Sequence, residues 1–383
     1  MNANTSRFRL WSGVWAGLLG LSLCGVATTA QVPPSTHTTV QDFLKVPVKP
    51  VAIGHHGVGP NLGSDPTIPI ENTVDSVRLA YTLGARVVEV DVQLTRDGRL
   101  AVIHNDYLSD FTCVHSLTLD QLQTRLPYVP ELRQIMNVAR EFNNKSGPAL
   151  DGILIVELKA FSPHCDPTDD FEAALVSTAV SEIQQSKMDS LVMFDSFSPA
   201  LLSLAAQMAP AIPRELDLDG LQLLTPTQIG GLTGLTVTIM TNKKNSLGLT
   251  WAEIGSVYRL PGYSSPQQFL GTGIATGVRV VGGEMDFFGP AEQQQPGSGS
   301  QFVAGAHSFG FRVFADPAQT AADWNFFAGL GVDAIYSNIS AGSGASAGDS
   351  QSGALRMRAS SAQPATAGRA PKKEGTIAMA GSK

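Results

Sequence analysis

Ionisable side chains interrupt four apolar runs of this sequence, close to the carboxyl end of each run. The runs are residues 51–53, 86–92, 100–104 and 153–158. Strands that alternate with helices form parallel sheets, and in a closed barrel of such strands the reacting groups lie at the carboxyl ends. The pattern therefore predicts one site made of His55, His56, Glu89, Asp91, His104, Glu157 and Lys159.

Two carboxylates of this set, Glu89 and Asp91, lie two residues apart in the second run. Side chains of a strand alternate between its faces, so both should point into the mouth of the barrel. Buried carboxylates repel each other unless a positive charge lies between them. Calcium or magnesium fits this place, with Glu157 as a third oxygen ligand. The alternative is a metal-free pair bridged by Lys159 or Arg86.

Two histidines, His55 and His104, arise from the runs on either side of these carboxylates. Cleavage of a phosphodiester needs a base for the attacking oxygen and an acid for the leaving alkoxide, and paired imidazoles supply both near neutral pH. Lys159 lies two residues after Glu157, on the same face, and can bind a phosphate oxygen. A purely structural role for the histidines is the alternative.

The rest of the sequence supplies the elements of an α/β fold, a TIM-type (β/α)8 barrel. A helix should begin at Asn72 or Thr73 and end at Gly84. The sequence contains nine strand candidates, one more than a barrel of eight strands needs. We assign the surplus run, 235–240, to an insertion over 213–265. The candidates are residues 51–53, 86–92, 100–104, 153–158, 191–194, 235–240, 278–281, 311–314 and 334–336.

Residues 1–30 have the composition of a cleaved signal peptide. Arg7 and Arg9 precede an uncharged apolar run, and small residues follow up to Ala30. We therefore expect a secreted or periplasmic protein. A membrane helix, or a lipid anchor at Cys24, is the alternative.

The remaining chain divides into a barrel domain, residues 31–339, and a tail, residues 340–383. The tail is rich in Ser, Ala and Gly and is predicted to be disordered. A formal net charge of −7 disfavours nucleic acid as a partner. The basic tail is compatible with transient contact to an anionic membrane surface, and the alternative is a solvated extension.

Two cysteines, Cys113 and Cys165, would remain after removal of the signal peptide. Export would place them in an oxidising compartment, where one disulfide is expected. Two unpaired thiols are the alternative.

Several motifs closely resemble those of the glycerophosphodiester phosphodiesterase family, a group of TIM-barrel enzymes. The resemblance spans roughly residues 50–338 and is weak over 200–310. The matching segments are Ile53-Gly54-His55-His56-Gly57, Glu71-Asn72-Thr73, residues 84–98, Val102-Ile103-His104, Pro130-Glu131-Leu132, Val156-Glu157-Leu158-Lys159, Ser196-Phe197 and residues 331–335.

The resemblance implies a role for each predicted site residue. Family residues that match His55 and His104 act as general acid and base. Those that match Glu89, Asp91 and Glu157 bind calcium or magnesium, the counterpart of Lys159 contacts phosphate, and that of Glu71 lines the site. The implied reaction is hydrolysis of a small-molecule phosphodiester of glycerol to sn-glycerol 3-phosphate and an alcohol.

Three departures from the family pattern concern the phosphate pocket. His56 stands where an arginine usually holds the phosphate, so phosphate binding should weaken or depend on pH. Asn105 follows His104, where an aspartate is usual. Phe314-Ala315 replaces a Trp-Thr pair, which should alter the far wall of the pocket.

Two other functions stay open at this point. A lysophospholipase D or sphingomyelinase D-like enzyme would use the same centre with an apolar rim, which leucines of the 213–265 insertion could supply. A non-catalytic binding module would account for His56 and Asn105 but not for the retained histidines and carboxylates.

Overall fold

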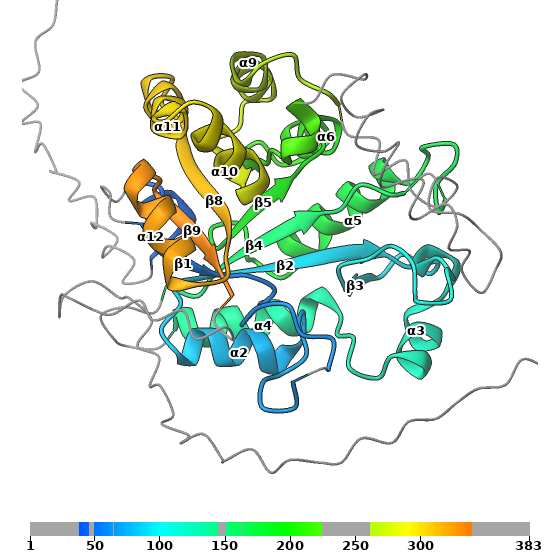
Figure 1. Cartoon of the computed structure of the whole chain (residues 1–383). Coiled ribbons are helices and arrows are strands. Elements are labelled where there is room, and N and C mark those ends of the chain that lie inside the picture. The colour runs from blue at the N-terminus through cyan, green and yellow to red at the C-terminus, as the bar shows by residue number, and fades with distance from the viewer. Residues whose placement is uncertain are drawn as a thin grey trace, which may run out of the picture. The chain divides into compact units, whose positions relative to one another are not determined.

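The structure is a computed structural model that describes residues 38–45, 50–63, 65–144, 151–162, 164–223 and 261–338 (Figure 1). These residues belong to one compact unit, His37–Lys383. The predicted signal peptide, the predicted tail and the strand predicted at 235–240 lie outside the described residues.

Eight parallel strands form a closed barrel, which confirms the predicted fold class. Around the barrel the strand order is β1-β9-β8-β7-β6-β5-β4-β2, and pairing between β1 and β2 closes the ring. The strands are β1 (Val51–Gly54), β2 (Val87–Leu94), β4 (Ile153–Leu158), β5 (Val192–Ser196), β6 (Arg214–Leu216), β7 (Val280–Glu284), β8 (Arg312–Ala318) and β9 (Ala334–Ser337).

Helices surround the strands on the outside of the barrel (Figure 1). They are α1 (Val40–Phe43), α2 (Val74–Thr82), α3 (Leu119–Arg125), α4 (Leu132–Asn143), α5 (Glu172–Gln185), α6 (Pro199–Met208), α9 (Pro266–Thr276), α10 (Met285–Gln294), α11 (Ser298–Ser308) and α12 (Ala321–Leu330). Thr73 caps α2 by accepting a hydrogen bond from the Ser76 amide, and Gly84 follows the helix with a φ of 103°. Among the described residues, no helix is both long and apolar enough to span a membrane.

Two apolar layers hold the barrel together. The larger lies between the strands and the surrounding helices, where burial of Leu, Val and Phe side chains supplies the main driving force. The smaller fills the barrel interior, where Ile53, Val87, Ile155 and Phe314 meet, and Phe43 of α1 packs on its lower end. Among the described residues, these side chains fill the interior of the barrel below the carboxyl ends of the strands.

The strand assignment from sequence was wrong in two places. The surplus strand is β3 (Leu100–Val102), which pairs antiparallel with β2 through a tight turn and is not part of the barrel. The barrel instead uses β6, inside the segment assigned to an insertion. β6 escaped notice because it is three residues long and two of them, Arg214 and Glu215, are charged.

Candidate active site

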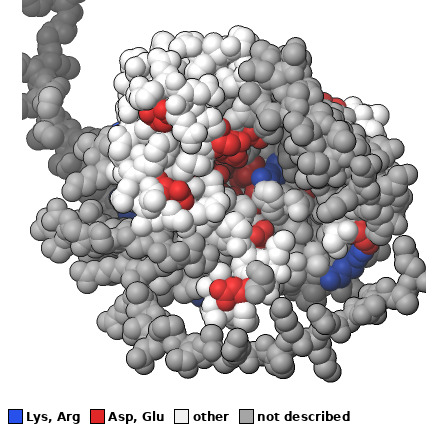
Figure 2. Space-filling model, viewed as in Figure 1, with Lys and Arg blue, Asp and Glu red and all other residues white. Residues whose placement is uncertain are grey.

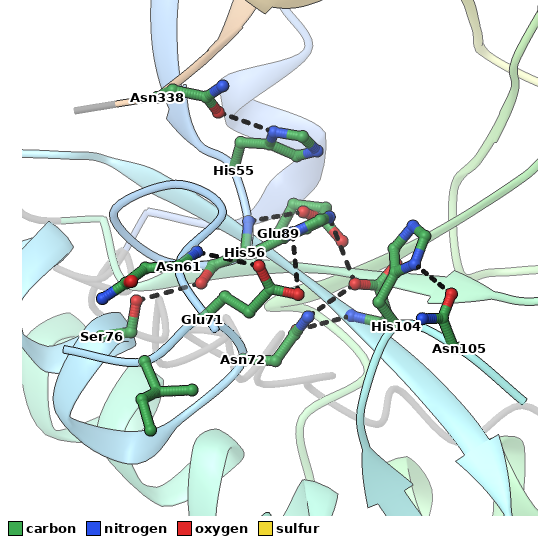
Figure 3. Close-up of polar contacts among 12 residues, drawn as sticks. His55, His56, Asn61, Glu71, Asn72, Ser76, Glu89, His104, Asn105 and Asn338 are labelled. Atoms are coloured by element: carbon green, nitrogen blue, oxygen red, sulfur yellow. Dashed lines mark hydrogen bonds and ion pairs between the residues drawn. The ribbon is translucent and has the colours of Figure 1, made fainter. Parts of the chain in front are cut away.

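The predicted site residues converge at the carboxyl ends of the barrel strands. Figure 2 shows acidic side chains gathered in a hollow at the centre of this face, beside a basic side chain. A cavity of about 180 Å³ opens there, lined by His104, Glu157, Lys159, Ala160, Phe197, Asp219 and Glu284. The close view in Figure 3 shows His55 and His104 on opposite sides of His56.

The three predicted metal ligands form a buried carboxylate triad. Glu89, Asp91 and Glu157 each present one oxygen, and these atoms lie within 4.8 Å of one another. Parallel pairing of β2 with β4 sets Asp91 beside Glu157, and the two-residue spacing in β2 brings Glu89 to the same side. The structure therefore brings all three carboxylates together.

Lys159 bridges Asp91 and Glu157, whereas the metal-free alternative had it between Glu89 and Asp91. Its ammonium group lies 2.9 Å from Glu157 Oε2 and 3.1 Å from Asp91 Oδ1. Arg86 takes no part, because its Nε donates to Asp151 over 2.5 Å. Burial opposes ionisation of Asp91, but Lys159 and His56 hold the pKa of this carboxyl well below its usual range.

A divalent cation nevertheless fits the triad. Glu89 is 2% exposed, and its Oε1 has no hydrogen-bond partner. Burial and the charge of Asp91 raise the pKa of Glu89 well above its usual value, and burial raises that of Glu157 to about 8 despite Lys159. Carboxylates crowded in this way favour binding of a hard cation, because its attraction offsets the free-energy cost of their desolvation. Glu89, Asp91 and Glu157 are the residues that would hold it.

His55 is held by residues distant in the sequence. Its Nδ1 lies 2.8 Å from Asn338 Oδ1, and its Nε2 lies 3.8 Å from Asp316 Oδ1. Burial lowers the pKa of His55, and Asp316 opposes this effect only in part. With Asn338 accepting from Nδ1, the neutral imidazole offers Nε2 as a base.

His104 lies just beyond β3, in the loop that follows the hairpin. Its Nδ1 is 3.0 Å from Asn105 Oδ1, so the asparagine that departs from the family pattern orients the ring. Gln93 donates to the His104 carbonyl over 3.1 Å and fixes the backbone. Lys159 and, after it, burial lower the pKa of His104 to about 4, so the imidazole is neutral at pH 7.

His56 lies between the other two imidazoles, with ring centroids 3.9 Å from His55 and 5.2 Å from His104. Its Nε2 is 3.3 Å from Asp91 Oδ2 and its Nδ1 is 3.9 Å from Glu71 Oε1. Burial opposes a charge on this ring, but Asp91 and Glu89 raise its pKa to about 10. His56 therefore carries a positive charge at pH 7, as the usual arginine would.

The backbone at His56 is held in a left-handed conformation, with a φ of 48°. The His56 amide donates to Glu89 Oε2 over 2.8 Å, and Ser76 Oγ donates to the His56 carbonyl over 3.0 Å. Ser76 Oγ also accepts from the Val58 amide over 3.0 Å. A side chain at Gly57 would lie 2.2 Å from Ser76 Oγ, which explains the glycine at that position.

Asn72 is a site residue that the sequence suggested only as a helix cap. Its Nδ2 donates to Asp91 Oδ2 over 2.7 Å, and its Oδ1 accepts from the Asp91 amide over 3.0 Å. The neighbouring Glu71 accepts from the Asn61 amide over 2.9 Å and faces His56 (Figure 3). The Glu71-Asn72 pair thus positions the carboxylate and imidazole at the centre of the site.

Four further carboxylates, not predicted from the sequence, form what we call the acidic wall. They come from four successive strands of the barrel and line a narrow cavity together with His55 and with Glu89 and Glu157 of the triad. The acidic wall consists of Asp195 in β5, Asp217 after β6, Glu284 at the end of β7 and Asp316 in β8.

Burial and the charge of Asp316 raise the pKa of Asp217 to about 7 and that of Glu284 to about 10. Phe314, expected in the pocket wall, instead packs in the barrel interior with Phe43 and Tyr336. The contribution of β8 to the site is therefore Asp316, two residues further along. The same two-residue spacing links Glu215 and Asp217 and was the available sequence signal at β6.

A disulfide between Cys113 and Cys165 joins the loops that follow β3 and β4, with the two Cα atoms 5.5 Å apart. Beside it, Asp106 Oδ2 accepts from the Ser162 amide over 2.7 Å. These loops leave the barrel next to His104 and Lys159, so the crosslink limits the motion of the rim around the site.

The fold and this geometry define a TIM-barrel protein with a carboxylate, histidine and lysine centre at the carboxyl ends of its strands. Residues 55–220 match the glycerophosphoryl diester phosphodiesterase family. A segment of 86 residues, 21% of the chain, is 40% identical to the glycerophosphocholine phosphodiesterase of Eremothecium gossypii, of which it covers 6%.

Two solved structures share the fold. One is the putative glycerophosphoryl diester phosphodiesterase of Silicibacter pomeroyi, with a TM-score of 0.54, 18% identity and coverage of 78% of this chain and 93% of that one. The other is an Oleispira antarctica phosphodiesterase in complex with the product sn-glycerol-3-phosphate, with a TM-score of 0.50, 20% identity and coverage of 76% and 93%. The chain is therefore similar to the glycerophosphoryl diester phosphodiesterase family over residues 55–220.

Proposed function

We propose that this protein hydrolyses glycerophosphodiesters to sn-glycerol 3-phosphate and an alcohol. The match of residues 55–220 to the family and the names of the relatives, one of them solved with sn-glycerol-3-phosphate, support this reaction. The observation that carries the proposal is that the ring nitrogens of His55 and His104 lie within 4.8 Å of Glu89 and Asp91 oxygens, respectively, with Lys159 beside the triad.

The residues of the chain can perform the acid–base chemistry. Lys159 and the protonated His56 offer positive charge for the phosphate oxygens. His104 and His55 have lowered pKa values, so either can accept a proton from the attacking oxygen. A phosphate anion bound beside the two imidazoles raises their pKa values, so one of them takes up a proton from water on substrate binding and donates it to the leaving oxygen, while the other, still neutral, accepts the proton of the attacking oxygen.

A divalent cation at Glu89, Asp91 and Glu157 would complete the site. When bound, calcium or magnesium neutralises phosphate charge and polarises the phosphoryl group. Both are hard cations that take oxygen ligands, in keeping with the all-carboxylate triad.

Incubation with glycerophosphocholine, followed by 31P NMR, tests this function. We expect sn-glycerol 3-phosphate to accumulate with calcium or magnesium, and a chelator to stop the reaction until metal is restored. A cyclic glycerol phosphate intermediate would have its own resonance and would identify attack by the glycerol 2-hydroxyl rather than by water. Absence of turnover on several glycerophosphodiesters with either metal would refute the proposal.

The alternative activity on lysophospholipids or sphingomyelin depends on an apolar rim within residues 213–265. Among the described residues, the cavity is lined on the side of β5 to β7 by Phe197, Asp219 and Glu284. A polar rim of this kind favours a small water-soluble substrate over a lipid chain. Faster release of choline from lysophosphatidylcholine than from glycerophosphocholine would reverse this preference.

We also propose export after removal of residues 1–30. The disulfide between Cys113 and Cys165 supports this location, because such bonds persist in oxidising compartments. N-terminal sequencing of the protein recovered outside the cytoplasm should begin at Gln31. Recovery of the full-length chain from the cytoplasm would contradict export.

A further inference from the structure

A second cavity meets the cavity beside Lys159 at His104. Its volume is about 360 Å³, against about 180 Å³ for the first. In the described parts of the chain, His104 is the residue that lines both. We call the second one the tyrosine cavity, because two tyrosines belong to its wall, and the apolar part of this wall consists largely of Leu62, Tyr107, Leu108, Leu126 and Tyr128. The acid–base chemistry proposed above does not use this space.

Polar groups that line the tyrosine cavity already have partners within the protein. Asn72 binds Asp91 through both the nitrogen and the oxygen of its side-chain amide. Arg125 forms an ion pair with Asp110, and Asn105 binds the imidazole next to it. An apolar group is therefore the ligand that gains most here, because the leucine side chains and tyrosine rings of the wall offer carbon surface to cover it.

Leu62 lies at the rim of the tyrosine cavity, with 72% of its surface exposed. It belongs to the loop between β1 and α2, and this loop is folded around the buried side chain of Asn61. Asn61 Nδ2 donates to the Ile68 and Pro69 carbonyls over 3.0 and 3.2 Å. The Asn61 amide donates to Glu71 Oε2 over 2.9 Å (Figure 3). The loop is thereby held in place, and it presents an apolar side chain to a ligand in the cavity.

Another part of the wall is held by the disulfide. Tyr107 pairs with Cys113 in an antiparallel bridge, and Cys113 is joined to Cys165. The ring of Tyr107 also stacks on that of Phe111, with the two centroids 5.3 Å apart. A cavity whose walls are fixed before binding does not lose affinity to the ordering of side chains and loops. The tyrosine cavity is therefore a preformed place for part of a ligand that is held at His104.

We infer that the tyrosine cavity binds the alcohol moiety of the substrate, and that the preferred alcohol carries an uncharged alkyl or arylalkyl group. The inference rests on the proposed function and names a substrate class for it. A phosphodiester at His104 has two arms, and the two cavities that meet there differ in size and lining. Lys159, Asp219 and Glu284 offer hydrogen-bond partners to the hydroxyls of glycerol in the smaller cavity. The larger cavity, with its leucines and tyrosines, is left for the alcohol.

A series of esters of sn-glycerol 3-phosphate tests the substrate class. The methyl, butyl and benzyl esters differ in the alcohol alone, and the three alcohols are of similar acidity. Complete burial of one methylene group changes binding by about fourfold. We therefore expect kcat/KM for the butyl and benzyl esters to exceed that for the methyl ester by at least about tenfold. Equal kcat/KM values for the three esters would overturn the inference.

Three variants locate the effect. Leu62→Asn removes an apolar contact at the rim and should lower the preference for the butyl over the methyl ester by about fourfold. Ile274→Asn is the matched control, because Ile274 is 54% exposed on α9 and lines neither cavity, and its preference should equal that of the wild type. Phe197→Ala tests the smaller cavity. Loss of the preference in Phe197→Ala, with the wild-type preference in Leu62→Asn, would place the alcohol beside Lys159 and refute the inference.

Calorimetric titration of the full-length protein with butyl phosphate and methyl phosphate, in the presence of calcium, separates failure of this inference from failure of the proposed reaction. We expect butyl phosphate to bind about tenfold more tightly than methyl phosphate, and this difference to shrink in Leu62→Asn but not in Ile274→Asn. That result supports the tyrosine cavity even if no diester is hydrolysed. Equal affinities for the two monoesters, or no detectable binding of butyl phosphate, would refute the inference even if glycerophosphodiesters are cleaved.

Discussion

Lys159→Met is the substitution that most directly probes the charge balance of the site. The ammonium lies 2.9 Å from Glu157 Oε2 and 3.1 Å from Asp91 Oδ1, and only 12% of the side chain is exposed. Methionine keeps most of the aliphatic stem and removes the charge. The variant therefore leaves Glu89, Asp91 and Glu157 buried together without their ammonium neighbour.

The expected loss of stability follows from these distances. One pair of unit charges about 3 Å apart, at an effective dielectric constant of about 20, contributes about 5 kcal/mol. At pH 7 Glu157, whose pKa is about 8, is mostly protonated, so the ion pair that the variant breaks is the one between Lys159 and Asp91. Removal of one partner from a buried ion pair typically lowers the free energy of unfolding by about 3–5 kcal/mol. We therefore expect Lys159→Met to lower it by about 3 kcal/mol at pH 7 in the presence of a chelator.

Urea unfolding with and without divalent cation measures this effect. In the presence of a chelator, the free energy of unfolding of Lys159→Met should be about 3 kcal/mol lower than that of the wild type. For Lys45→Met it should be lower by less than about 0.5 kcal/mol. Lys45 is the control because its side chain is 73% exposed and lies 3.9 Å from Asp42. Calcium or magnesium should restore much of the stability of Lys159→Met, because the cation replaces the missing positive charge.

NMR titration of the imidazoles gives a second measure of the same substitution. Lys159 is the main cause of the low pKa of His104, about 4, so that pKa should rise toward 6.5 in Lys159→Met. In the wild type, protonation of His104 destabilises the fold as pH falls from 6.5 to 4, and in the variant this pH window should narrow. Equal stability of Lys159→Met and Lys45→Met, an unchanged His104 pKa, or no restoration by divalent cation would refute the reasoning.

Three other substitutions test separate parts of the account. His55→Ala and His104→Ala should each lower kcat by about 10²- to 10⁴-fold with an unchanged circular dichroism spectrum, and wild-type turnover in either would remove that residue from the mechanism. Ser76→Ala should cost about 2 kcal/mol in urea unfolding, because two buried backbone groups lose their partner. A loss below about 0.5 kcal/mol would contradict that contact. Replacement of both Cys113 and Cys165 by Ser opens a crosslink across 52 positions and should cost about 4 kcal/mol on thermal or urea unfolding, whereas unchanged stability would show that the crosslink is dispensable.

Local patterns in the sequence were sufficient for the centre of the site. Alternation in β2 places Glu89 and Asp91 on one face, and this property depends on the strand alone. Helix capping at Thr73 is also local, and it was predicted from adjacent residues. These features share one cause, since each is decided within a few residues of backbone.

Contacts between distant segments could not be predicted in this way. Asn338 orients His55 across 283 positions, and no pattern near either residue indicates the pairing. β6 is stabilised by its neighbours on both sides, and Arg214 is buried only because it donates to the Ile212 and Gly277 carbonyls. Asp217 of the acidic wall follows β6, so its place beside the other three carboxylates could not be predicted without that strand.

Turnover of glycerophosphocholine by the wild type and by Glu89→Gln, measured alongside cation binding, tests the central claim most directly. Glu89 is buried and has an oxygen without a hydrogen-bond partner, which would be a ligand of the proposed cation. Stabilisation by such a metal is worth several kcal/mol, and about 2.7 kcal/mol corresponds to a hundredfold change in rate. We predict that the wild type releases sn-glycerol 3-phosphate, and that Glu89→Gln binds calcium or magnesium more weakly and reacts at least about a hundredfold more slowly. Wild-type turnover in Glu89→Gln would contradict the account.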